Sequence, residues 1–169
     1  MRRLAATLAV LTVSVLALHA QQPGGSIEPP TGASVLLEAH GDGLQIYTCT
    51  AAQDGLKWVL KAPDAKLLDA SGNAIGTHFA GPTWRLLDGS QVQGELLASK
   101  PAPEPDSVAW LLLRAKPATG TGILAGVAFI RRSQTHGGAA PATGCHDPAD
   151  AGKTASVHYT ATYTFYALK

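Results

Sequence analysis

Short apolar runs separated by turn residues recur along most of the chain. From residue 33 onward the runs are divided by Gly, Pro, Asn, Asp and Ser at intervals of roughly 8 to 12 residues. The predicted strands are 35–38, 44–50, 57–61, 66–69, 74–79, 83–87, 91–98, 108–115, 123–131 and 157–167. This spacing is typical of an all-β sandwich or barrel. We therefore predict one antiparallel β domain over 33–169, a two-layer sandwich, with a partly open barrel as the alternative.

The last run has the clearest period of two. Its odd positions from Val157 to Phe165 are mostly large and apolar, whereas its even positions from His158 to Thr164 are polar. Because successive side chains of a strand point to opposite faces, this pattern predicts a half-buried strand. The runs 110–113 and 123–130 are apolar at nearly every position, so we expect them to be central strands covered on both faces. Turns are expected between runs, including one at 41–43.

The N-terminus has the pattern of a secretory leader. Arg2 and Arg3 precede an apolar stretch from Leu4 to Leu18 that is followed by small residues, and cleavage is expected after Ala20. This stretch is shorter than the roughly 20 residues that cross a bilayer, so no membrane span is expected after cleavage. We predict a signal peptide over 1–20, a flexible lead-in rich in Pro and Gly over 21–32, and a secreted or periplasmic protein.

Charge and cysteine content narrow the classes of partner and compartment. Without Arg2 and Arg3, the 13 basic residues become 11 against 12 acidic ones, with no basic stripe for a phosphate backbone, so nucleic-acid binding is not expected. The only two cysteines, Cys49 and Cys145, predict one disulfide in an oxidising compartment. A thiolate metal site with His146 is the alternative, but no paired C-x-x-C spacing supports it.

Several catalytic motifs can be tested against the chain. The segment 120–126 has the glycine spacing of a dinucleotide fingerprint, but too few residues follow it for the helix that would hold a pyrophosphate. A nicotinamide-dependent dehydrogenase is therefore not expected. The chain has no G-x-S-x-G elbow, and its five histidines beyond residue 20 have no metal-binding spacing. We predict no cofactor and no metal.

The densest group of unusual residues is 76–90, which contains the pattern H-x-x-G-P-x-W-x-x-x-D-G-S. Together with segments 45–49, 110–113, 130–138 and 159–166 and with Trp58 and Cys145, it resembles the exported bacterial and fungal family catalogued as domain of unknown function 3455. The resemblance implies no established activity. Some fungal relatives carry a malate dehydrogenase label. We do not apply this label to the chain, because segment 120–126 is not followed by the helix that a dinucleotide-binding site needs. Where the family usually has Arg-Leu-Asn-Thr, this chain has Arg132-Ser133-Gln134-Thr135.

Three residues of the 76–90 segment form the candidate ligand site. His78, Trp84 and Asp88 could converge at one end of a sheet, where an indole face would stack on a ligand and the two polar groups would orient it. The alternative is that Trp84 belongs to the core, while backbone groups satisfy His78 and Asp88. Arg131 and Arg132 are adjacent and could bind an anion or simply be solvated.

We predict a noncatalytic binding module for a small polar molecule or a saccharide. Two alternatives remain open from the residues alone. One is an extracytoplasmic enzyme that uses a metal or paired carboxylates, and the other is a structural envelope or secreted protein that meets partners through a strand edge.

Overall fold

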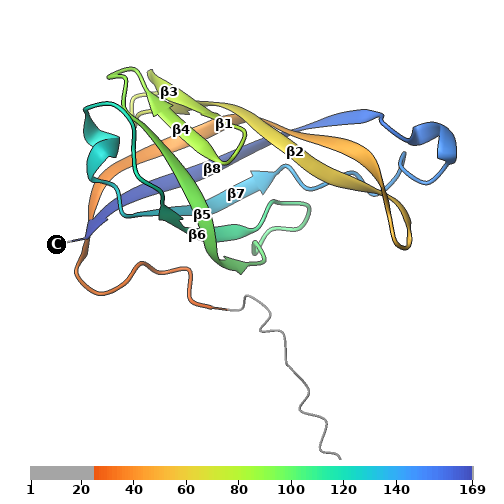
Figure 1. Cartoon of the computed structure of the whole chain (residues 1–169), viewed down its shortest axis with the longest axis horizontal. Coiled ribbons are helices and arrows are strands. Elements are labelled where there is room, and N and C mark those ends of the chain that lie inside the picture. The colour runs from red at the N-terminus through yellow and green to blue at the C-terminus, as the bar shows by residue number, and fades with distance from the viewer. Residues whose placement is uncertain (1–24, 169) are drawn as a thin grey trace, which may run out of the picture.

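The computed structural model describes residues 25–168 and consists of eight β-strands and two short 3₁₀-helices (Figure 1). The predicted leader, and the first four residues of the predicted lead-in, lie outside the described residues. The strands are β1 (Ala33–Ala52), β2 (Gly55–Leu68), β3 (Ala74–Phe79), β4 (Thr83–Leu86), β5 (Gln91–Lys100), β6 (Trp110–Ala115), β7 (Phe129–Gly137) and β8 (Thr154–Leu168). The helices are η1 (Ile123–Gly126) and η2 (Pro148–Asp150). None of these helices is long and apolar enough to cross a membrane.

The strands form one antiparallel sheet in the order of the sequence. Each strand pairs with the next, and β8 also pairs with β1, so the sheet closes into a barrel. The predicted all-β class and antiparallel pairing are confirmed. The sequence predicted a two-layer sandwich, with a partly open barrel as the alternative, and the order of strand pairing is that of a barrel. Strands β1, β2 and β8 are the longest and extend beyond the shorter strands β3 to β6 (Figure 1).

Strand β1 corrects one sequence prediction. The segment 41–43 was expected to be a turn between two strands, but β1 runs through it without interruption and pairs with β2 and β8 on its two sides. The glycines allow close packing here. A Cβ atom on Gly41 would lie 2.5 Å from Cε2 of Tyr163, and one on Gly43 would lie 2.2 Å from the carbonyl oxygen of Asp64. Glycine is needed at these positions because neighbouring groups pack directly against the backbone. Close approach of this kind is a common reason for glycine within a strand.

The prediction for 123–131 was also partly wrong. Residues Ile123–Gly126 form η1, and the strand that follows is β7, which begins only at Phe129. Gly122 precedes the helix at φ 155°, and its hypothetical Cβ would lie 2.3 Å from a carboxylate oxygen of Asp88. The glycine-rich sequence therefore ends in a tight turn against Asp88 before the chain returns to the sheet.

The barrel interior is filled by the apolar face predicted for the last strand. Tyr159, Ala161, Tyr163 and Phe165 of β8 are all buried, and they pack in one cluster with Trp84. Burial of apolar side chains in this core stabilises the folded state by roughly 25 cal/mol per Å² of apolar surface removed from water. The alternation predicted which side chains of β8 lie inside, but the prediction of a half-buried strand is wrong for its second half: Thr162, Thr164 and Tyr166 on the other face are buried too.

A disulfide joins Cys49, near the end of β1, to Cys145 in the connection between β7 and β8. Their Cα atoms are 5.5 Å apart, and 96 positions separate them in the sequence. On the chain-entropy model, closing a loop of this length stabilises by about 4 to 5 kcal/mol. The bond therefore links the two halves of the chain where the long strands extend beyond the rest of the barrel.

The described part of the lead-in contacts the barrel. Ile27 is buried with Ala98 and Leu112, and Glu28 forms an ion pair with Arg131. Residues 25–32 contain no strand or helix, and β1 begins directly after them.

Candidate functional site

His78 and Trp84 lie together, but in the barrel core. They are opposite each other on β3 and β4, their rings are stacked with centroids 4.5 Å apart, and each is at most 2% exposed. Tyr163 covers the same pair, with its ring centroid 5.0 Å from that of His78. The packing leaves the indole face in contact with an imidazole of the protein itself.

Burial determines the protonation state of His78. Desolvation lowers its pKa to about 4, a nearby backbone hydrogen bond raises it, and the charge of Arg132 lowers it further. The imidazole is therefore neutral at neutral pH. Its Nδ1 lies 2.9 Å from the carbonyl oxygen of Thr83, which can only accept, so Nδ1 carries the proton. His78 is a fixed member of the core that donates to the backbone.

Asp88 lies apart from His78 and Trp84, just beyond the C-terminal end of β4, where its carboxylate is already hydrogen-bonded. It follows the strand in the turn to β5, four residues after Trp84, which is roughly 13 Å along an extended chain. Its carboxylate accepts hydrogen bonds from the side chain and the backbone N–H of Ser90 and from the N–H of Ile123. These bonds lower the pKa of Asp88, with the Ser90 hydroxyl as the largest cause. The structure thus brings His78 and Trp84 together but not Asp88. The Asp88 carboxylate instead connects the β4–β5 turn to η1 by hydrogen bonds.

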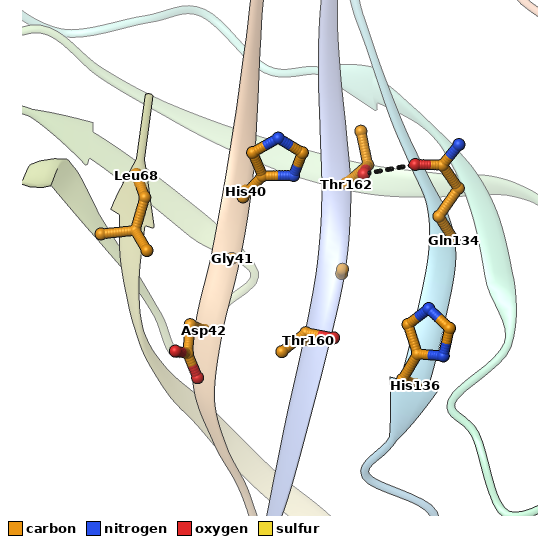
Figure 2. Close-up of a pocket in the computed structure, with 9 residues that line it drawn as sticks. His40, Gly41, Asp42, Leu68, Gln134, His136, Thr160 and Thr162 are labelled. Carbon is orange, nitrogen blue, oxygen red and sulfur yellow. Dashed lines mark hydrogen bonds between the residues drawn. The ribbon is translucent and has the colours of Figure 1, made fainter. Parts of the chain in front are cut away.

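A groove lies on the outer face of the barrel, across the four neighbouring strands β2, β1, β8 and β7 (Figure 2). It has a volume of about 330 Å³. Its lining residues are His40, Gly41 and Asp42 of β1, Leu68 of β2, Gln134 and His136 of β7, and Thr160, Ala161 and Thr162 of β8. We call it the β1–β8–β7 groove.

The register of the ladders explains which side chains meet there. His40 is opposite Thr162, and Asp42 is opposite Thr160. On the other side of β8, His136 is also opposite Thr160. Figure 2 shows the two imidazoles on opposite sides of the threonines of β8. Because neighbouring strands are about 4.8 Å apart, β1 and β7 lie roughly 10 Å from each other, which leaves space for a small ligand over β8.

A bulge in β7 shapes one wall of the groove. The pairing with β8 shifts between Ser133 and His136, and Gln134 within it has φ 48°, in the left-handed region. A residue other than glycine costs roughly 1 kcal/mol or more in this conformation, so the surrounding contacts must hold it. The buried hydroxyl of Thr162 donates a hydrogen bond of 2.8 Å to Oε1 of Gln134 (Figure 2). This bond holds the Gln134 side chain in place, and its NH₂ group remains as a hydrogen-bond donor.

Two exposed contacts between a histidine and a carboxylate border the groove. Nε2 of His158 lies 2.7 Å from a carboxylate oxygen of Asp42, and His136 contacts the carboxylate of Glu104. Exposed pairs of this kind contribute at most about 1 kcal/mol, so they orient side chains more than they stabilise the fold. The groove therefore combines imidazole, hydroxyl and amide donors with carboxylate acceptors over a backbone floor.

This arrangement is suited to binding a hydroxylated molecule through a mixture of donated and accepted hydrogen bonds. Within residues 25–168, no group of three or more His, Cys, Asp or Glu side chains is placed to hold a metal ion. No Phe, Tyr or Trp side chain lines the groove, so it offers no phenyl, phenol or indole face on which a ligand could stack.

Sequence reasoning missed the groove, although part of the signal was present. The polar face of the last strand was predicted and contains Thr160 and Thr162. His40 and His136 were noted only as isolated histidines, because no motif connects them. Their proximity depends on the pairing of β1 and β7 with the same strand, which no local pattern reveals.

The fold and these sites define a class of protein: an eight-stranded antiparallel barrel with one internal disulfide, a packed aromatic interior and an open groove on its outer wall. The family model described as Protein of unknown function (DUF3455) matches residues 29–167. The chain belongs to this family, which confirms the resemblance seen in segment 76–90 and in the other segments named with it. No curated protein and no solved structure matches the chain.

Proposed function

We propose that this protein is an exported, noncatalytic binding module that takes a small hydroxylated molecule, such as a saccharide, in the β1–β8–β7 groove. The observation that carries the proposal is the placement of His40 and His136 on either side of Thr160 and Thr162, around a groove of about 330 Å³. Sugar hydroxyls both donate and accept hydrogen bonds, and this groove offers both kinds of partner.

Export is supported by the sequence of 1–20 and by the Cys49–Cys145 disulfide, since disulfides persist mainly in oxidising compartments. The groove takes the place of the site first considered at His78, Trp84 and Asp88. In that set the imidazole and indole occupy the core, and the carboxylate is already bonded to Ser90 and Ile123.

The experiment is a ligand titration with a panel of mono- and disaccharides and polyols, using protein purified with its disulfide intact. A ligand that binds only the folded state raises the melting temperature by mass action. We expect at least one panel member to raise the melting temperature of the wild type and to shift backbone amide resonances of 160–162. We expect the double substitution His40→Ala and His136→Ala to weaken its Kd by about tenfold or more, because truncating polar partners costs about 1.4 kcal/mol or more.

His146→Ala is the matched control, because it removes an exposed imidazole that lies outside the groove. It should leave the affinity unchanged. The proposal is wrong if no saccharide or polyol binds, or if a binding response is the same in the double variant as in the wild type. Turnover of a bound saccharide by the wild type would instead support the enzymatic alternative.

A further inference from the structure

A second cavity opens at one end of the barrel, where β1 begins, β2 and β4 end, and η1 lies beside them (Figure 1). Its volume of about 300 Å³ is close to that of small-molecule sites. It shares no lining residue with the β1–β8–β7 groove. The lining residues are Leu37 of β1, Asp69 after β2, Ile75 of β3, Leu86 of β4, Leu87 and Asp88 after β4, and Ile123 of η1. We call it the end cavity.

The inner part of the end cavity belongs to the hydrophobic core. Leu86 is buried there, and Leu37 and Ile75 pack as half-buried residues against the same cluster. These three aliphatic side chains come from three different strands, so the cavity continues the core toward solvent. A ligand that contacts them gains free energy by removing apolar surface from water.

The rim of the end cavity exposes two more large apolar side chains. Leu87 is 80% exposed and Ile123 is 49% exposed. A single exposed apolar residue is ordinary, but two that line one apolar cavity mark a candidate binding site. The two rim segments are also held together, because the backbone N–H of Ile123 donates a hydrogen bond of 3.0 Å to the carboxylate of Asp88. The cavity is therefore already formed and needs no opening step.

Two carboxylates give the end cavity a negative charge. Asp69 and Asp88 line it, whereas no Lys, Arg or His of residues 25–168 does. Neither carboxylate belongs to an ion pair formed within the described chain. Hydrogen bonds lower both pKa values, chiefly from the Asn73 side chain to Asp69 and from the Ser90 hydroxyl to Asp88, so both groups are ionised at neutral pH. Charge of one sign attracts a cation and repels an anion.

We propose that the end cavity binds a small apolar molecule that carries an ammonium group. Its hydrocarbon part would contact Leu37, Ile75 and Leu86, and its ammonium group would lie beside the carboxylates of Asp69 and Asp88. Charge complementarity selects this occupant, because the same carboxylates repel a fatty acid of equal length. The site is separate from the β1–β8–β7 groove and takes a different class of ligand.

The test compares three probes of equal chain length at neutral pH and low salt: hexylammonium chloride, 1-hexanol and sodium hexanoate. The protein is ¹⁵N-labelled and has its disulfide intact. We expect hexylammonium to shift the backbone amide resonances of Ile75, Leu87 and Ile123 saturably and to raise the melting temperature. Its Kd should be lower than that of hexanoate by about tenfold or more, with hexanol between them. Added sodium chloride should reduce this difference, because salt screens exposed charges.

Leu87→Lys tests the site directly, because it removes an apolar side chain from the rim and places a positive charge there. We expect it to weaken the hexylammonium Kd by about tenfold or more. The matched control is Leu96→Lys, which makes the same change at a 52% exposed position of β5 that does not line the cavity. It should bind hexylammonium as the wild type does. If Leu87→Lys does not fold, the comparison of the three probes on the wild type decides.

The groove variant with His40→Ala and His136→Ala should bind hexylammonium as the wild type does, so failure of the groove and failure of the end cavity are distinguishable. The proposal is overturned if hexylammonium does not bind, if hexanoate binds as tightly, or if Leu87→Lys has the affinity of the wild type. Sedimentation of the unliganded protein covers one more occupant. A wild-type dimer that Leu87→Lys dissociates would mean that a second copy covers the cavity, and it would also overturn the proposal.

Discussion

The inner and outer faces of the barrel wall are built from the same strands but hold their polar residues differently. Inside, His78 is stacked on Trp84 and bonded to the backbone, and burial keeps it neutral. Outside, His40 and His136 border an open groove with side chains that water reaches. The difference shows that an imidazole of this chain is packed in the core or exposed to solvent according to the face on which the strand places it.

The largest expected effect tests the inner face. Trp84→Ala removes a 1% exposed indole that contacts His78, Tyr163 and Phe165, and we expect it to lower the free energy of unfolding by about 3 to 5 kcal/mol. Urea denaturation of the oxidised protein measures this change. Leu87→Ala is the control, because Leu87 is 80% exposed and its truncation should cost about 0.5 kcal/mol or less. Similar stability of the two variants would contradict the assignment of Trp84 to the core.

The second prediction concerns the pH dependence that His78 gives to stability. Its folded pKa of about 4 lies below the unfolded value of 6.5, so the unfolded state binds more protons between these two values. The His78 contribution is fully present above pH 6.5 and is lost as the pH falls to about 4, where the loss reaches about 3 kcal/mol.

The measurement is a series of denaturation curves between pH 4 and pH 7 for the wild type and for His78→Phe. The phenyl ring has a similar shape and cannot titrate. The stability difference between the two proteins should change with pH in that window, with the wild type falling faster toward acid. A constant difference would mean that His78 is not protonated on unfolding.

A smaller effect tests how closely the inner face is packed. Gly41→Ala places a methyl group 2.5 Å from the ring of Tyr163, which is fully buried and cannot turn away freely. Overpacking of this kind costs about 1 to 3 kcal/mol. Gly126→Ala is the control, since the nearest atom to its Cβ is at 3.4 Å on the side chain of Leu36. Equal melting temperatures of the two variants would show that Gly41 is not needed for the approach of Tyr163.

The smallest effect is expected on the outer face. The double substitution His40→Ala and His136→Ala should change the free energy of unfolding by about 0.5 kcal/mol or less, because both side chains are exposed. The same urea measurement serves here. Strong destabilisation would assign these histidines to the structure and would remove the contrast between the two faces.

Several features of this fold could be read from local patterns. The alternation in β8 predicted which side chains would be inside, because the two faces of a strand follow from covalent geometry. The gaps between the predicted strands 66–69 and 74–79 and between 83–87 and 91–98 are turns in the structure, since Asp, Ser, Asn and Gly have specific conformational roles there. The glycines at 41 and 43 misled the prediction, since a glycine required by a turn and one required by a close neighbour look the same in the sequence.

The candidate site shows the same limit. The patterns indicated an all-β domain, a cysteine pair and a polar face on the last strand, since each depends on residue type or on near neighbours in the chain. The groove depends on which strands pair and in what register. Closure of β1 onto β8 brings residues from opposite ends of the chain together, and the packing of the whole core selects that register.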